Sequence, residues 1–162
     1  MNRKKTLKVY LILVGTSLIA LGLRKISAVL RQQSGLELQM GFVMTKNTRS
    51  MFEVLFRKKI DTSQGLIPAK DHAEIAFELT DADVVGFSTM TEDANDTRLL
   101  INEIRKVNSG VFVIWGGAHA ILNPEDAILY ADAVCVNEGE QAVKELFIRF
   151  PTGNMSLLFP SC

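Results

Sequence analysis

Three apolar runs, separated by stretches with helical patterning, occupy the chain between residues 83 and 146. The runs are Asp83–Met90, Val111–Trp115 and Asp132–Val136. Uninterrupted apolar runs are typical of parallel strands that helices cover on both faces. Their alternation with helices predicts right-handed crossover connections and an open α/β sheet.

Each of these runs stops at glycine or at small polar residues. The segments concerned are Ser88–Met90, Gly116–His119 and Asn137–Gly139. Open α/β sheets bind their ligands outside the carboxyl ends of the strands. We therefore expect a ligand crevice along these three segments.

The first half of the chain supplies two further strands, Leu7–Val14 and Leu36–Met44, on either side of a helix over about 18–33. From Thr45 to Lys70 the pattern weakens, with a short helix expected over 50–59. Five strands in this layout predict a flavodoxin-like, doubly wound parallel sheet of order 2-1-3-4-5. Its switch point, where the strand order reverses, lies between the first and third strands.

Capping residues and helical spacing predict the remaining helices of the domain. The remaining helices are expected from Asp71 to about residue 79, over about 93–107, from Asn123-Pro124 onward, and over about 140–150. Residues 1–150 should then form one α/β domain, and residues 151–162 a tail or a connector to an absent domain.

Composition and charge narrow the class of protein. The 162 residues are 48% hydrophobic, and 18 basic side chains balance 18 acidic ones. This is typical of a globular domain, and no net field favours nucleic acid or an anionic membrane as a partner. Cys135 lies in an expected core strand and Cys162 ends the chain, which favours a reduced, cytoplasmic compartment over a disulfide.

The N-terminus allows an alternative interpretation. Arg3–Lys5 followed by Val9–Leu23 is similar to the basic and apolar regions of a secretory signal. The apolar stretch is interrupted at Gly15–Ser17, and a strand followed by a helix explains the whole pattern. No stretch reaches the roughly 20 apolar residues that a transmembrane helix needs.

Other functions found on such sheets have recognisable sequence patterns at the ends of the first and third strands. Val14–Ile19 lacks the Gly-x-Gly-x-x-Gly pattern of dinucleotide sites, and the third strand ends in Ser88 where a phosphate-accepting receiver domain needs an acid. Thr16 and Ser17 could bind a flavin phosphate at a helix N-terminus, or serve as ordinary caps.

The combination of strand ends is more specific than any one of them. Val85–Met90, Trp115–His119, Asn123–Glu125 and Asn137–Glu140 together resemble the cobalamin-binding domain at the front of many radical SAM enzymes. The resemblance extends from Leu7 to Leu146 and is poor between residues 45 and 70. It implies a corrinoid held at the carboxyl ends of the strands.

This resemblance assigns roles to the strand ends. Gly116 and Gly117 would leave room for the nucleotide tail of cobalamin, although a tight turn also uses one such glycine. A bulky residue at Gly117 is then expected to block binding and leave the fold intact. Ser88 and Thr89 would hydrogen-bond the tail base, or simply end the strand. The full set of expected cofactor-binding residues is Gly15, Thr16, Ser88, Thr89, Met90, Gly116, Gly117, Ala118, His119, Asn137, Glu138 and Gly139.

The chain departs from related families in two respects. Residues 14–19 contain no Asp-x-His-x-x-Gly motif, so water or another side chain would face the lower side of cobalt. We expect His119 to line the site without binding the metal, and His72 to lie at the surface. The Cys-x-x-x-Cys-x-x-Cys cluster of radical SAM catalysis is also missing, so no iron–sulfur centre is expected in this chain.

The resemblance therefore implies a cofactor module without catalytic residues of its own. Methyl transfer or radical chemistry would be carried out with a radical SAM catalytic domain, attached to this one or on a partner chain. Two alternatives stay open, an interaction domain of the same fold that has lost its cofactor and a flavin-binding electron carrier.

Overall fold

A computed structural model describes residues 6–15, 21–45, 67 and 69–149. These residues form a five-stranded parallel sheet in the order β2-β1-β3-β4-β5, which confirms the predicted flavodoxin-like order. The strands are β1 (Leu7–Gly15), β2 (Leu36–Met44), β3 (Val84–Thr89), β4 (Phe112–Gly116) and β5 (Ala133–Val134).

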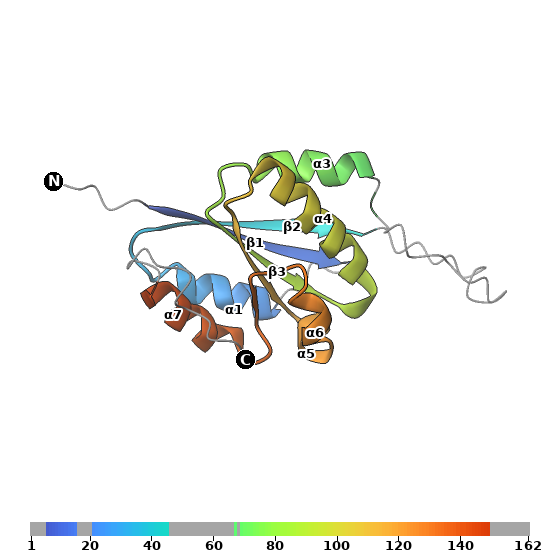
Figure 1. Cartoon of the computed structure of the whole chain (residues 1–162). Coiled ribbons are helices and arrows are strands. Elements are labelled where there is room, and N and C mark those ends of the chain that lie inside the picture. Colours follow the sequence, from blue (N-terminus) through green and yellow to red (C-terminus); the bar gives the residue numbers. More distant parts are fainter. Residues whose placement is uncertain (1–5, 16–20, 46–66, 68, 150–162) are drawn as a thin grey trace.

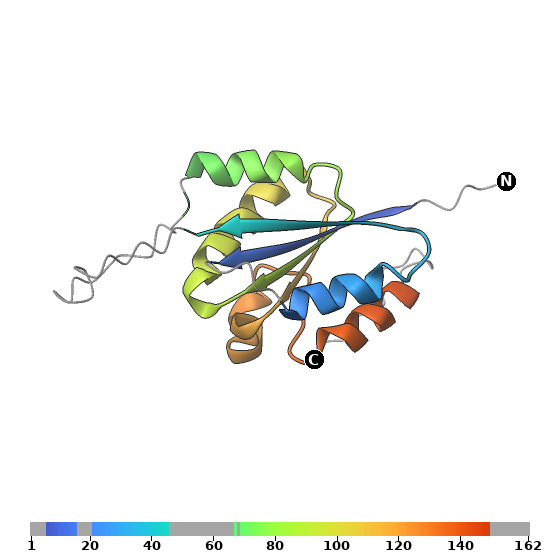
Figure 2. The ribbon, with the colours of Figure 1, turned by 180° about the vertical axis from the view of Figure 1, so that it is seen from behind.

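Helices cover both faces of this sheet (Figure 1). They are α1 (Leu21–Leu30), α3 (Ala69–Glu78), α4 (Ala94–Val107), α5 (Ala118–Leu122), α6 (Pro124–Ala127) and α7 (Gly139–Arg149), with a 3-10 turn, η1 (Thr91–Asp93). Figure 2 shows α1 and α7 side by side on one face, with α3 and α4 on the other. The expected helix over 50–59, Thr16 and the tail over 151–162 lie outside the described residues.

Two of the predicted elements are short. The helix that begins after Asn123 ends at Ala127, and β5 has only two paired residues. A separate helix, α5, fills the space between β4 and α6. The helix expected from Asp71 begins at Ala69, so Asp71 lies in the first turn of α3. None of the helices in the described part of the chain is long and apolar enough to cross a membrane.

The strands build two cores because successive side chains of a strand point to opposite faces. On β3, Val84 packs with Leu23 and Leu30 of α1, whereas Val85 packs with α4. The α4 side chains in that second core include Leu100, Ile101 and Ile104, whose spacing places them on one helical face.

One expectation about the histidines is wrong. His72 was expected at the surface, but only 2% of it is exposed. It shares a helical face with the buried Ala76, four residues further along α3, and that face packs on α4. There its Nε2 lies 3.2 Å from Oδ1 of the buried Asp96.

Candidate functional site

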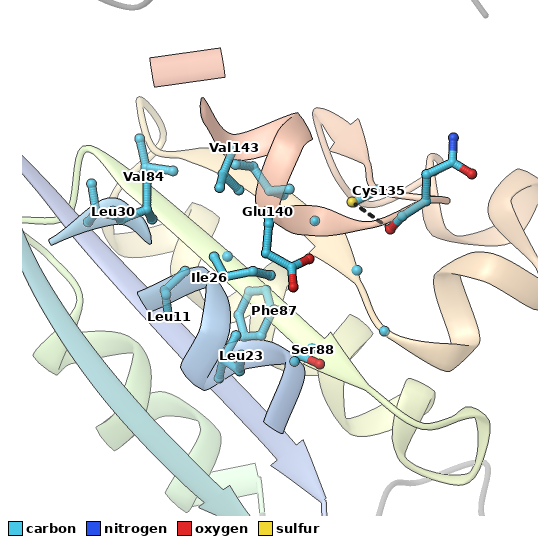
Figure 3. Close-up of a pocket in the computed structure, with 18 of the residues that line it drawn as sticks. Leu11, Leu23, Ile26, Leu30, Val84, Phe87, Ser88, Cys135, Glu140 and Val143 are labelled. Atoms are coloured by element: carbon cyan, nitrogen blue, oxygen red, sulfur yellow. Dashed lines mark hydrogen bonds between the residues drawn. The ribbon is translucent and has the colours of Figure 1, made fainter. Parts of the chain in front are cut away.

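A pocket of about 200 Å³ lies between the sheet and the pair of helices α1 and α7 (Figure 3). Its lining includes the middle and the carboxyl ends of β3 and β4, together with the segment that joins β5 to α7. We call it the α1–α7 pocket. It extends to the edge of the sheet at which α/β folds of this kind hold ligands.

The floor of this pocket is hollow because small residues recur on one face of the sheet. Val84, Gly86 and Ser88 alternate along β3, and Gly116 of β4 is paired with Ser88. A Cβ atom on Gly86 would lie 3.0 Å from Cδ2 of Leu11. A larger residue at position 86 would therefore press on the Leu11 side chain, which also lines the pocket, and would reduce the space above the floor.

Aliphatic and aromatic side chains of the two helices form the walls. Leu23, Ile26 and Leu30 project from one face of α1. Val143 and Phe147 project from α7 opposite them. The two helices approach closely at the start of α7. A Cβ atom on Gly139 would lie only 2.6 Å from Cδ1 of Ile26.

Polar side chains of the described lining gather at the rim, and they are Ser88, Cys135, Asn137 and Glu140. The Glu140 carboxylate lies between α7 and the Ser88 hydroxyl (Figure 3), and its Oε1 is 3.9 Å from Nζ of Lys25. The Cys135 thiol donates a 3.5 Å hydrogen bond to the carbonyl of Asn137. Burial raises the pKa of this thiol, so it stays protonated at neutral pH.

The pocket brings together five of the residues expected from the sequence. They are Ser88, Gly116, Gly117, Asn137 and Gly139. Gly15, Thr89, Met90, Ala118, His119 and Glu138 lie outside its lining. Met90 is 57% exposed just beyond β3, and Glu138 is exposed just before α7. Gly15 is buried at the end of β1, where a Cβ atom would lie 3.3 Å from Oδ2 of Asp93.

Thr89 and His119 face the opposite core. The Thr89 hydroxyl shares a 2.9 Å hydrogen bond with the hydroxyl of Thr97 on α4. His119 is only 3% exposed, and its Nε2 lies 2.8 Å from Oδ2 of Asp126. Burial alone would raise the pKa of Asp126, but hydrogen bonds from Arg98 and His119 outweigh it and lower that pKa. Both residues therefore take part in the packing of α4 and α6.

The backbone conformation at position 117 requires glycine. Its φ angle is +91°, and a Cβ atom there would lie 2.6 Å from the backbone nitrogen of Thr89. The expectation that a bulky residue at Gly117 leaves the fold intact is wrong, because any side chain would collide with the end of β3. Gly116 is different, since a Cβ atom there would meet Cys135 Cβ at an ordinary contact distance of 3.5 Å.

Sequence reasoning missed Gly86 and Glu140 as pocket residues. Gly86 carried a usable signal, because a glycine inside a buried strand often marks a close approach by a ligand. Its spacing of two from Ser88 also places both residues on one face of β3. Glu140 had no comparable signal, since acids at the start of a helix are common for electrostatic reasons alone.

The sequence matches the B12 binding domain family over residues 7–147. The chain belongs to this family. It is also similar to a bacteriochlorophyllide d C-8(2)-methyltransferase of Chlorobaculum tepidum, with 31% identity over 94 residues. That match covers 53% of this chain and 20% of the methyltransferase, so the chain spans only a small part of the length of this relative.

The cofactor that the family implies is cobalamin, and the residues of the α1–α7 pocket fit one part of it. Cobalamin carries a nucleotide tail that ends in a flat aromatic base. The pocket over Gly86 and Gly116, between walls of aliphatic side chains, leaves room for such a group. The polar rim suits the sugar and phosphate that follow the base.

Proposed function

We propose that this domain binds cobalamin with the tail base inside the α1–α7 pocket and the corrin ring over the carboxyl ends of the strands. The observation that carries the proposal is the pocket itself, which combines an apolar interior with a polar rim at that edge. Its size and shape derive from residues of this chain, independently of the family match.

The expected site residues divide between two parts of the cofactor in this proposal. Ser88, Asn137 and Gly139 contact the tail at the rim, and Gly116 gives it passage. Met90, whose flexible and polarisable side chain is exposed beyond β3, packs against the corrin ring.

We further propose that the chemistry takes place with a radical SAM catalytic domain, attached to this domain or on a partner chain. Cobalamin supplies a transferable methyl group or assists radical chemistry when it is bound. The matched relative supports this, since it is a methyltransferase of which the similar segment is only 20%. This chain would then hold and orient the cofactor while another domain holds the substrate.

Replacing Gly86 with valine tests the pocket assignment. The new side chain would crowd Leu11 and project into the floor, whereas valine suits a buried strand and leaves the rim unchanged. We expect the affinity for hydroxocobalamin, measured by calorimetric titration, to fall by about tenfold or more.

Gly41→Val is the matched control. Gly41 lies within β2, outside the lining of the pocket, and a Cβ atom there would meet Ile12 Cγ1 at an ordinary distance of 3.7 Å. This variant should bind hydroxocobalamin as the wild type does. Equal affinity of the wild type and a well-folded Gly86→Val would contradict the proposed position of the tail.

A further inference from the structure

The interior of the α1–α7 pocket contains hydrocarbon side chains and a glycine. Its deep end is formed by Val9, Leu30, Val84 and Phe147, each of which is at most 6% exposed. Val84 precedes the rim residue Ser88 by four positions on β3, which corresponds to about 13 Å along a strand. Ser88 therefore lies far from this end, and Glu140 precedes Phe147 by about two turns of α7.

Backbone groups offer no substitute for polar side chains in the floor. Leu11 and Gly86 are register partners between β1 and β3, and Gly86 and Ile114 between β3 and β4. The N–H and C=O groups of the central strand are therefore committed to the two ladders that flank it. A water molecule could not bridge the gap either, because it too needs polar partners.

The edge of a group that enters this interior must accordingly carry no hydrogen-bonding atoms. Corrinoid tails differ in this respect. Dimethylbenzimidazole presents two methyl groups at the edge of its ring, whereas adenine presents an amino group and ring nitrogens. An unpaired buried donor or acceptor weakens binding by about tenfold or more.

We propose that the α1–α7 pocket selects corrinoids whose tail ends in an apolar ring, such as dimethylbenzimidazole, and discriminates against those that end in a purine. This inference rests on the proposed function, because it concerns the part of the cofactor inside the same pocket. The rim residues Ser88 and Glu140 contact the polar sugar in both kinds of corrinoid. Discrimination therefore arises in the interior.

Titrating the full chain with three corrinoids tests this proposal. The ligands are hydroxocobalamin, the corresponding corrinoid with adenine as its base, and cobinamide, which has no nucleotide tail. We expect hydroxocobalamin to bind about tenfold or more tightly than the adenine form, and cobinamide to bind more weakly than hydroxocobalamin.

The other outcomes separate the two proposals. Equal affinity for hydroxocobalamin and the adenine corrinoid, both above that for cobinamide, would overturn the selectivity and leave the proposed function standing. Equal affinity for all three, or no binding of any by folded protein, would overturn the tail pocket and the selectivity with it.

Discussion

Ser88 and Thr89 are neighbours on β3 whose side chains belong to different parts of the molecule. Ser88 lines the α1–α7 pocket, and Thr89 bonds to Thr97 of α4 in the opposite core. Successive side chains of a strand point to opposite faces of the sheet, so these neighbours have different surroundings. Ser88 is therefore the hydroxyl that can meet a ligand in the pocket.

The contacts of His119 indicate a role in helix packing. Its ring lies 5.2 Å from that of Trp115, and it shares Asp126 with Arg98. We expect His119→Ala to lower the free energy of unfolding by about 2 kcal/mol, because a buried hydrogen bond and ring packing are lost. Urea denaturation measures this effect.

Cobalamin affinity should change little in the same variant. His119 lies outside the lining of the pocket, so only a general loosening of α5 would reach the rim. A large loss of affinity without loss of stability would show instead that the imidazole contacts the cofactor.

At the level of elements, Asp93 connects the strand ends at the switch point. It lies at the end of η1, is fully buried, and accepts a 2.6 Å hydrogen bond from Thr45, next to the end of β2. Its other carboxylate oxygen faces Gly15 of β1 and has no hydrogen-bond partner among the described residues. Burial raises the pKa of this carboxyl above its ordinary value of 3.8, more than the bond from Thr45 lowers it.

This shift predicts a pH-dependent stability. The native state holds a proton on Asp93 that the unfolded chain releases near pH 3.8, so the contribution of Asp93 is full below that pH and declines as pH rises toward the raised native pKa. Relative to Asp93→Asn, which does not titrate, the wild type should lose stability as pH rises above about 4.

Denaturation of both proteins at several pH values measures the difference. Glu125→Gln, which removes one acid at an exposed position, serves as the control for the change of charge. A difference that stays constant, or that grows in favour of the wild type as pH rises, would contradict the raised pKa of Asp93.

Over the whole molecule, the two helical layers have separate tasks. The layer of α3 and α4 closes one face of the sheet with a dense core that includes Trp115 and Leu100. The layer of α1 and α7 leaves a cavity over Gly86. Binding on one face can therefore be altered by substitutions in the pocket while the other face maintains the fold.

Much of this architecture could be predicted from the sequence, because apolar runs and helical spacing report directly on burial. The strand order and the importance of the ends of β3 and β4 follow from that pattern. The faces on which Thr89 and His119 lie could not be predicted, since they depend on where β3 ends and where α5 begins to within one residue. The burial of His72 depends on how α3 packs against α4, and no local signal reports that contact.

The absorption spectrum of bound hydroxocobalamin at neutral pH tests the central claim most directly. A tail base held in the α1–α7 pocket cannot coordinate cobalt at the same time. We therefore predict that saturating protein converts the spectrum from the base-on form to the base-off form. A spectrum that stays base-on at saturation would show that the tail remains on the metal and that the pocket does not hold it.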